Sequence, residues 1–266
     1  MKAIINYPGS KWSLAHWIIG YFPEHHSYLE PFFGSGAVFF NKQRSNIETI
    51  NDLDGNVVNL FRCIRENPER LAYEIHYTPY SRKVYDEAFL EIPEEPFEKA
   101  VNFCVRLNMG HGFRTTGEKV GWKNDVQGRE RAYAAKDWRE MPERILAAAE
   151  RLRGVQIENM PAVELIRRFN DPKVLIYCDP PYMLETRHGK QYRCEMDDDQ
   201  HIELLKVLLK HQGPVLLSGY ASALYDDYLR GWHKEETISY NQAAQKRREV
   251  LWMNFDPGNV QMKMTL

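Results

Sequence analysis

The chain has 266 residues, of which 43% are hydrophobic and 27% charged, and its net charge is −2. This length allows one large domain or a core domain with an insertion, and the composition is that of a soluble globular protein. No apolar stretch reaches the ~20 residues of a membrane span, and the N-terminal segment breaks too early for a signal peptide, so we expect a cytoplasmic protein without a membrane partner. The four cysteines lie far apart without a metal-site spacing, which favours reduced thiols and no bound metal.

The first sixty residues alternate helix and strand signals. We expect a helix over 10–19, strands over 28–30 and 48–51, a helix that opens at 37–40, and another helix over 56–64. Strand, glycine loop, helix, strand and acid, in this order, are typical of a parallel α/β half-domain.

A glycine loop, residues 33–36, joins the first strand to the following helix signal. Its glycines would let a ligand approach the backbone closely at the positive end of a helix. Asp52 ends the next strand, sixteen residues after Gly36, where an acid can accept hydrogen bonds from ribose hydroxyls. Phe39 replaces the third glycine of a dinucleotide fingerprint, which favours a nucleoside without pyrophosphate, such as S-adenosylmethionine. Taken alone, the loop also fits a tight structural turn.

The N-terminal segment places Tyr7 and Lys11 on either side of a Pro-Gly turn. The lysine could neutralise a cofactor carboxylate and the aromatic ring could pack on the cofactor. A surface turn with a solvated lysine is the other interpretation.

The middle of the chain, residues 67–153, is predicted to be mainly helical, with prolines marking the breaks. It contains a segment rich in glycine and polar residues, 108–124, which is too long for a simple connection and suggests a functional loop or hairpin. Between residues 106 and 153, eleven basic residues stand against seven acidic ones. This local excess suits a nucleic-acid surface, although a solvated helical surface would also explain it.

The α/β pattern returns after residue 154. We expect strands over 155–157, 174–178, 215–218 and 249–255, and helices over 163–169 and 200–210. The simplest architecture is one sheet interrupted by an inserted helical domain. The predicted parts are 1–66, 67–153 and 154–266.

A corner follows the apolar strand at 174–178: Asp179-Pro180-Pro181-Tyr182. It leaves a carboxylate, a rigidly held backbone carbonyl and an aromatic ring at the carboxyl end of a buried strand. Open α/β sheets bind their ligands at this edge.

Taken in order, these segments resemble the Dam-like (D12 class, α group) DNA adenine-N6 methyltransferases. The match runs through residues 7–11, 30–40, 51–54 and 179–182. In the α group, the target-recognition domain lies between the cofactor motif and the catalytic motif, as the helical segment does here. The resemblance implies a Rossmann-like α/β sheet dependent on S-adenosylmethionine, with an inserted, mainly helical domain that recognises double-stranded DNA.

The resemblance also implies a set of residues for the cofactor and for the reaction. The cofactor contacts would be Tyr7, Lys11, Glu30, Phe33, Gly34, Ser35, Gly36, Asp52 and Asp179. Asp179 and the carbonyl of Pro180 would accept the two N–H bonds of the adenine amino group and draw its nitrogen towards tetrahedral geometry. Because that amino group is inaccessible inside a duplex, the base would be flipped out, and Tyr182 would stack on it.

DNA contacts are expected in two polar loops, one in the helical part and one, 185–193, after the catalytic motif. Arginine and asparagine can read base edges, whereas lysines mainly hold phosphates, and a basic loop with aromatic residues suits the backbone around a flipped base. The candidates are Asn108, His111, Arg114, Thr116, Lys119, Lys123, Arg187 and Tyr192.

The backbone around residue 160 is expected to recognise the cofactor adenine, because Met160-Pro161-Ala162 stands where related enzymes often carry an acidic or polar residue.

Two other functions are left open by the motifs. One is methylation of RNA or another amino acceptor, which is disfavoured because an asparagine in place of Asp179 would be usual for glutamine or guanine targets. The other is a catalytically silent DNA-binding module, which the full set of cofactor residues disfavours. A cognate restriction endonuclease is a further candidate partner, and the motifs do not fix the oligomeric state.

Overall fold

The computed structural model describes residues 1–112, 114–124, 134–187, 189–240 and 246–259, and the chain forms two compact units. The helical unit contains residues 1–10, 54–153 and 191–193, and the sheet unit contains 11–53, 154–190 and 194–266. The sequence prediction began the helical part at 67, whereas the helical unit already includes α2 (Gly55–Glu66), which packs on helices α3, α5 and α7. In the described parts of the chain, no helix combines the length and the apolarity that crossing a bilayer would require.

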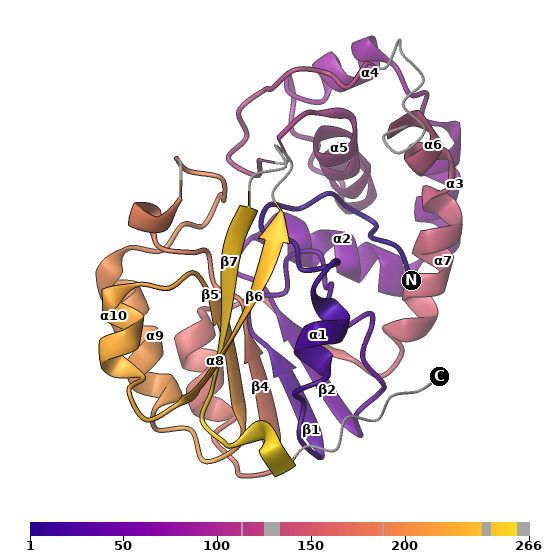
Figure 1. The fold of residues 1–266 in the computed structure, drawn as a ribbon. Coiled ribbons are helices and arrows are strands. Elements are labelled where there is room, and N and C mark those ends of the chain that lie inside the picture. The colour runs from indigo at the N-terminus through magenta and orange to yellow at the C-terminus, as the bar shows by residue number, and fades with distance from the viewer. Residues whose placement is uncertain (113, 125–133, 188, 241–245, 260–266) are drawn as a thin grey trace. The chain divides into compact units, whose positions relative to one another are not determined.

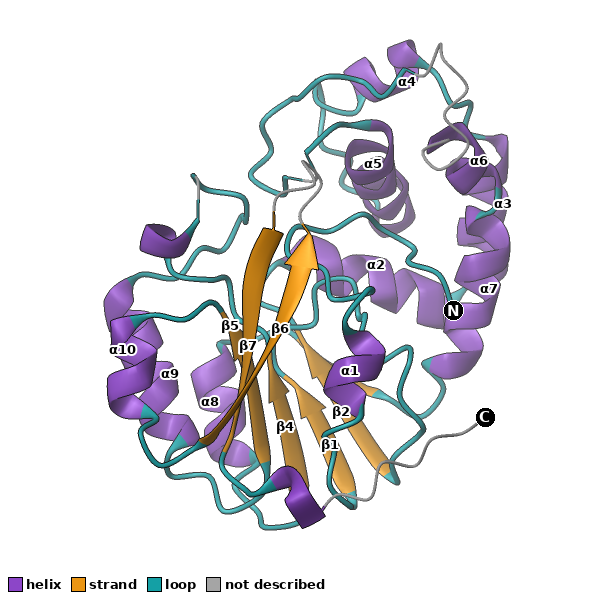
Figure 2. Ribbon diagram, in the orientation of Figure 1, coloured by secondary structure: helices purple, strands orange, loops and turns teal. Residues whose placement is uncertain are grey.

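The strands among the described residues of the sheet unit form one mixed sheet (Figures 1 and 2). Its strands are β1 (Ser27–Glu30), β2 (Ile47–Asn51), β3 (Gln156–Glu158), β4 (Val174–Cys178), β5 (Val215–Gly219), β6 (His233–Tyr240) and β7 (Lys246–Met253). Their order is β3-β2-β1-β4-β5-β7-β6. The first five pair in parallel, and β7 is antiparallel to both β5 and β6. The order 3-2-1-4-5 is that of a doubly wound sheet, so the predicted Rossmann-like α/β fold is confirmed.

The central strand β4 is buried at all five positions, as expected of a parallel strand covered on both faces. Ile176 and Cys178 belong to the apolar cluster between the sheet and its helices. Tyr177 points to the opposite face, where its ring lies 6.3 Å from that of Phe22. Side chains therefore alternate strictly between two covered faces.

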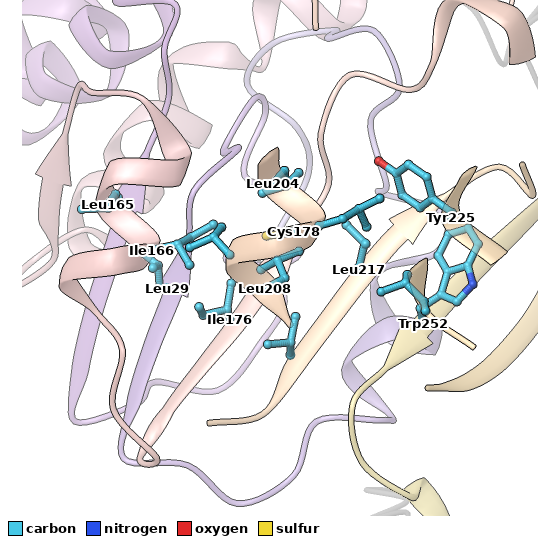
Figure 3. Packing of buried hydrophobic residues seen from close by; sticks show 14 of the residues in the cluster. Leu29, Leu165, Ile166, Ile176, Cys178, Leu204, Leu208, Leu217, Tyr225 and Trp252 are labelled. Carbon is cyan, nitrogen blue, oxygen red and sulfur yellow. The ribbon is translucent and has the colours of Figure 1, made fainter. Parts of the chain in front are cut away.

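Three helices cover the first of these faces: α8 (Ala162–Arg168), α9 (Asp198–Leu208) and α10 (Ala223–Tyr228). Figure 3 shows Leu165 and Ile166 of α8 and Leu204 and Leu208 of α9 gathered around the strand residues. Helix α9 begins in a capping box, in which Asp197 and Gln200 exchange side-chain and backbone hydrogen bonds. The remaining helix of this unit, α1 (Ala15–Ile19), is shorter than the predicted 10–19 because the residues before it form turns.

Residues 37–40 were predicted to open a helix, but they form only turns. The amide side chain of Asn41 donates to the carbonyl of Ala37 at 2.7 Å, the acceptor that its own N–H would use in an α-helix. The N–H of Asn41 instead donates to the carbonyl of Val38 at 3.1 Å. Competition from a short polar side chain thus ends the helix at its first turn.

The helical unit is organised by caps and prolines. Its helices are α2, α3 (Pro68–Tyr77), α4 (Arg82–Glu87), α5 (Pro96–Met109), α6 (Ala134–Arg139) and α7 (Met141–Arg151). Asp54 accepts from the N–H of Asn56 at 3.0 Å and caps α2, and Asn67 caps α3 in the same way. Prolines 68, 96 and 142 lie in the first turns of helices, where their missing N–H costs nothing.

Candidate active site

The site lies where the direction of strand order reverses in the sheet. β1 and β4 are neighbours, but the order continues from β1 to β2 on one side and from β4 to β5 on the other. Ligands of open α/β sheets bind at such a switch point, beyond the carboxyl ends of the strands. The segment 31–36 follows β1 and the segment 179–182 follows β4, so both predicted motifs end at this edge.

An ion pair occupies the end of β4. The Nζ atom of Lys11 lies 3.0 Å from Oδ1 of Asp179, with the two side chains 5% and 18% exposed. The Lys11 ammonium thus forms an ion pair with a buried carboxylate oxygen. Burial raises the pKa of Asp179, and the charge of Lys11 acts in the opposite direction. The lysine predicted to meet a cofactor carboxylate therefore stabilises the charge of Asp179.

The ring of Tyr182 is held on several sides. Lys11 Nζ lies 4.6 Å from its centroid, and the ring of Tyr220 meets it edge-on at 4.6 Å. Its hydroxyl donates to Oε2 of Glu249 at 2.7 Å. Burial and then the charge of Glu249 raise the pKa of Tyr182 well above its ordinary value, so the phenol is a neutral donor. The sequence analysis did not find Tyr220 or Glu249.

The glycine loop is tied to the acid after β2. Gly34 and Gly36 both have positive φ, at 50° and 67°. The N–H of Gly34 donates to Oδ2 of Asp52 at 2.8 Å, and the hydroxyl of Ser35 accepts from the indole of Trp12 at 3.2 Å. The loop and Asp52 therefore form one preorganised element, and Asp52 stays partly exposed.

Gly36→Ala is expected to damage this loop. A Cβ atom there would lie 2.5 Å from Cζ of Phe33 and 2.7 Å from Cε2 of Phe40, in a conformation that only glycine adopts easily. We expect the free energy of unfolding to fall by about 2 kcal/mol or more and the affinity for S-adenosylmethionine to fall by about tenfold. Urea unfolding and titration calorimetry measure both quantities. The control is Gly231→Ala in the same unit, where nothing lies within 4 Å of the new Cβ; equal behaviour of the two variants would contradict the prediction.

Glu30 ends β1 as a buried acid, with 2% of its surface exposed. It accepts a hydrogen bond from the hydroxyl of Tyr28 at 2.6 Å and another from the backbone of Phe39. Burial raises its pKa from 4.5 to about 8, and the charge of Asp179 adds to the rise. Glu30 therefore holds the turn after the glycine loop, and its predicted contact with the cofactor stays a prediction.

Glu30→Gln is expected to change the pH dependence of stability. Because the pKa of Glu30 is raised to about 8 in the folded protein, its contribution is fully present below 4.5 and is lost as the pH rises through 8. Glutamine imitates the protonated acid, so the variant should match the wild type near pH 4 and exceed it at pH 9 by up to about 4 kcal/mol. Urea unfolding across this range measures the difference, and parallel pH curves for the two proteins would contradict the prediction.

Asn51 is a positioning residue that the sequence analysis missed. Its amide group donates to the carbonyls of Pro31 and Met160, at 2.9 and 3.0 Å, and accepts from the N–H of Met160 at 3.0 Å. Its own carbonyl accepts from Phe33 at 2.9 Å. The N–H and carbonyl of Met160, expected to serve the cofactor adenine, are therefore occupied by Asn51.

Arg187 was predicted to contact DNA, but its side chain is 8% exposed. Its Nε donates to the carbonyl of Tyr182 at 2.6 Å, and its guanidinium pairs with Glu195 and bonds to the carbonyl of Gly189. Arg187 therefore fixes the chain after the catalytic motif and is not presented to a phosphate.

Asn108, predicted to read a base, is buried in the helical unit. Its Nδ2 donates to the carbonyls of Cys104 and Ile4, at 2.9 and 3.3 Å. Its Oδ1 accepts from the N–H and side chain of Asn6, at 3.2 and 2.9 Å. All its amide groups are used in joining the N-terminal segment to α5, and these hydrogen bonds disfavour the predicted contact of Asn108 with a base.

The predicted loop 108–124 is closed by an antiparallel bridge between Gly110 and Trp122. The hydroxyls of Tyr80 and Tyr85 donate to the carbonyls of Lys123 and Val120, both at 2.9 Å. The polar segment thus has a fixed base on the helices of its own unit.

The side chains predicted to contact DNA from this loop differ in exposure. His111, Arg114 and Lys119 are exposed, and the last two pair with Glu118 and Asp86. Thr116 is partly exposed and accepts from the N–H of Glu118 at 3.5 Å. Lys123 donates to the carbonyl of Asn108 at 3.3 Å, and burial lowers its pKa to about 8.

Tyr7 and Tyr192 also belong to the helical unit, with their rings 6.0 Å apart. Their predicted contacts, with the cofactor and with DNA respectively, stay predictions.

Comparison with known proteins gives one consistent result. The sequence model of the family of D12 class N6 adenine-specific DNA methyltransferases matches residues 7–245. The DNA adenine methylase of Salmonella typhi is 23% identical over 286 residues, which cover 97% of this chain and 96% of that protein. The DNA adenine methylases of Escherichia coli (strain K12) and Vibrio cholerae (serotype O1, strain ATCC 39541) are 23% and 24% identical, covering 97% and 96% of this chain and 97% and 96% of their own lengths.

Among solved structures, the SAM-dependent methyltransferase from Agrobacterium tumefaciens is similar with a TM-score of 0.37 at 10% identity, covering 92% of this chain and 61% of that chain.

Proposed function

Because the chain belongs to the D12 class of N6 adenine-specific DNA methyltransferases, we propose that Asp179, Pro180 and Tyr182 carry out its reaction on an adenine flipped out of duplex DNA. The class transfers a methyl group from S-adenosylmethionine to the N6 amino group of adenine in DNA. The observation that carries the proposal is the end of β4, where Asp179 is paired with Lys11 beside the ring of Tyr182.

Asp179 and Pro180 would activate the amino group. Its nitrogen is a poor nucleophile because its lone pair is delocalised into the adenine ring. The Asp179 carboxylate and the Pro180 carbonyl accept its two N–H bonds, which draws the nitrogen towards tetrahedral geometry. The carboxylate also stabilises the positive charge that develops on the nitrogen and takes up its proton. Bound S-adenosylmethionine supplies the electrophilic methyl group on its sulfonium sulfur.

Tyr182 would bind the flipped base by stacking. Aromatic stacking contributes about 1–3 kcal/mol per base and tolerates any base, so the choice of adenine falls to the two acceptors. The neutral phenol keeps a full negative charge away from the base.

The residues around the switch point fit a nucleoside cofactor with a charged amino-acid tail. Asp52 is an acid at a strand end, tied to the loop yet partly exposed, where it can accept from ribose hydroxyls. Gly34 and Gly36 have positive φ and carry no side chains, so the backbone of the loop can adopt a tight turn that a ligand can approach closely. Phe33 and Ser35 shape the loop from within, and Lys11 supplies the nearby positive charge.

The exposed members of the loop 108–124 would read the DNA sequence. Arg114 can bond to two acceptors of guanine at once, and His111 can bond to a base edge, whereas Lys119 and Lys123 would hold phosphates. Thr116 and Tyr192 complete the proposed contacts. With a net charge of −2 on the whole chain, binding would depend on this local surface and fall steeply with salt.

The proposed function is tested by mapping methylated adenines in DNA from cells that express the protein, and then by replacing the mapped adenine with 2-aminopurine. We expect one short sequence to be methylated, and the fluorescence of the 2-aminopurine duplex to rise on binding as the base leaves the stack. A mapped site whose 2-aminopurine stays quenched in the complex would contradict base flipping.

We also propose a cognate restriction endonuclease as a partner. An extract of the source cells should then cut unmethylated DNA at the mapped site and spare methylated DNA, and equal survival of both substrates would remove this partner.

A further inference from the structure

Glu249 is a buried acid on β7 that the described reaction does not use. It is 8% exposed, and its Oε2 accepts the hydroxyl of Tyr182 at 2.7 Å. Its Oε1 accepts the hydroxyl of Ser239, on the adjacent strand β6, at 3.3 Å. The carboxylate thus links the end of the Tyr182 side chain to the antiparallel hairpin of the sheet.

The other contacts of Tyr182 leave its hydroxyl as the point where Glu249 acts. Lys11 lies over the ring at 4.6 Å, and Tyr220 meets the ring at an interplanar angle of 68°. Arg187 holds the Tyr182 carbonyl at 2.6 Å. These groups restrain the backbone and one side of the ring, but only a partner at the hydroxyl restrains rotation of the far end of the side chain.

Burying a carboxylate costs free energy that a neutral residue at this position would avoid. The cost is offset here by two hydrogen bonds, one of which goes to a residue of the catalytic motif. The C–O bond lies on the axis about which the ring turns, but the phenolic O–H prefers to lie in the plane of the ring. A short hydrogen bond from Tyr182 to a fixed carboxylate therefore restrains both the position of the far end of the ring and its rotation about that axis. A ring that must stack on a base gains from being held in that plane before the base arrives.

We infer that Glu249 is a positioning residue, which acts through the hydroxyl of Tyr182 to hold the ring in the plane on which the flipped adenine stacks. The inference rests on the proposed function in that it takes Tyr182 as the stacking residue. Glu249 itself does not touch the base. Its charge also raises the pKa of Asp179, so the test must separate the route through the Tyr182 hydroxyl from a direct electrostatic effect on Asp179.

The test is a double-mutant cycle on single-turnover methyl transfer to a duplex containing the mapped site. We expect Glu249→Ala to slow transfer by about tenfold, because a hydrogen bond to a charged group is lost. Glu249→Gln keeps an oxygen acceptor and should stay within about threefold of the wild type. Tyr182→Phe keeps the ring but removes the hydroxyl, and in that background Glu249→Ala should cause less than about a twofold further loss.

The same variants are compared by 2-aminopurine fluorescence. Glu249→Ala should lower the signal of the bound duplex relative to the wild type, whereas the affinity for S-adenosylmethionine should stay unchanged. Thermal melting identifies any variant that fails to fold. If Glu249→Ala fails to fold, the cycle uses Glu249→Leu in its place, because leucine also lacks an acceptor and fills more of the buried space. The matched control is Glu236→Gln on β6, whose carboxylate pairs with Lys234 and Arg248 on the surface.

A tenfold loss that is equal in the wild-type and Tyr182→Phe backgrounds would overturn the inference, as would Glu249→Ala transferring methyl groups at the wild-type rate. A wild-type complex without a 2-aminopurine signal would instead contradict base flipping, and the kinetic cycle would still decide whether Glu249 acts through Tyr182.

Discussion

Asp179→Asn is expected to lower methyl transfer to DNA adenine by about 10²–10³-fold, the effect of removing a preorganised charge from the position where the transition state develops its own. Asparagine keeps the shape and one acceptor oxygen, but it carries no negative charge and cannot take up the proton. Single-turnover transfer of a labelled methyl group measures the loss. DNA binding should be largely retained, because the change affects only the contact with the flipped adenine and leaves the contacts proposed for the loop 108–124 in place.

The wild-type enzyme should also show the titration of this acid. Burial raises the pKa of Asp179, so the acid limb of the pH–rate profile should lie above the ordinary value of 3.8. Below that limb the carboxyl is neutral and the rate falls. The control is Asp227→Asn, an exposed acid paired with Arg230, which should leave the rate within about twofold. An Asp179→Asn enzyme as fast as this control would contradict the role of Asp179.

Lys11→Met is expected to be nearly as damaging, through both stability and rate. It leaves the buried Asp179 carboxylate without its opposite charge, which costs about 3–5 kcal/mol when one partner of a buried pair is removed. Because the charge of Lys11 lowers the pKa of Asp179, its removal should move the acid limb of the pH–rate profile to higher pH. The protonated, inactive form of Asp179 would then persist to higher pH than in the wild type.

The sign of the stability effect follows from the same titration. A carboxyl whose pKa is raised by folding favours the folded state while protonated, and this contribution is lost as the pH rises through the folded pKa. Lys11→Met should therefore be closest to the wild type at low pH and become more destabilised as the pH rises, as measured by urea unfolding. Adding Asp179→Asn to Lys11→Met should restore stability at pH 8 without restoring activity. An unshifted acid limb in Lys11→Met would contradict the proposed coupling.

The parts of the site that follow strands of the sheet could be predicted from the sequence. An apolar run that ends at Asp179 identifies β4, and a short strand before a glycine loop identifies β1. In a parallel sheet these ends share one edge, so the meeting of the two motifs follows from the strand pattern alone.

The residues that support the site could not be predicted in this way. Glu249 lies 67 residues from Tyr182 and on a strand whose first half is charged, so no local pattern connects the two. β6 itself was missed because it is a mostly polar edge strand, without the alternation that marks a half-buried one. Asn108 and Arg187 have side chains typical of DNA contacts, and only their burial and hydrogen bonds show that they hold the protein's own backbone.

The central claim is that this chain methylates the N6 atom of adenine in duplex DNA by means of Asp179. It is tested most directly by incubating the protein with labelled S-adenosylmethionine and duplex DNA, digesting the DNA, and identifying the labelled nucleoside by mass spectrometry. We expect the label in N6-methyladenine, with the signal lost in Asp179→Asn. Label in another nucleoside, label in RNA only, or equal labelling by Asp179→Asn would contradict the claim.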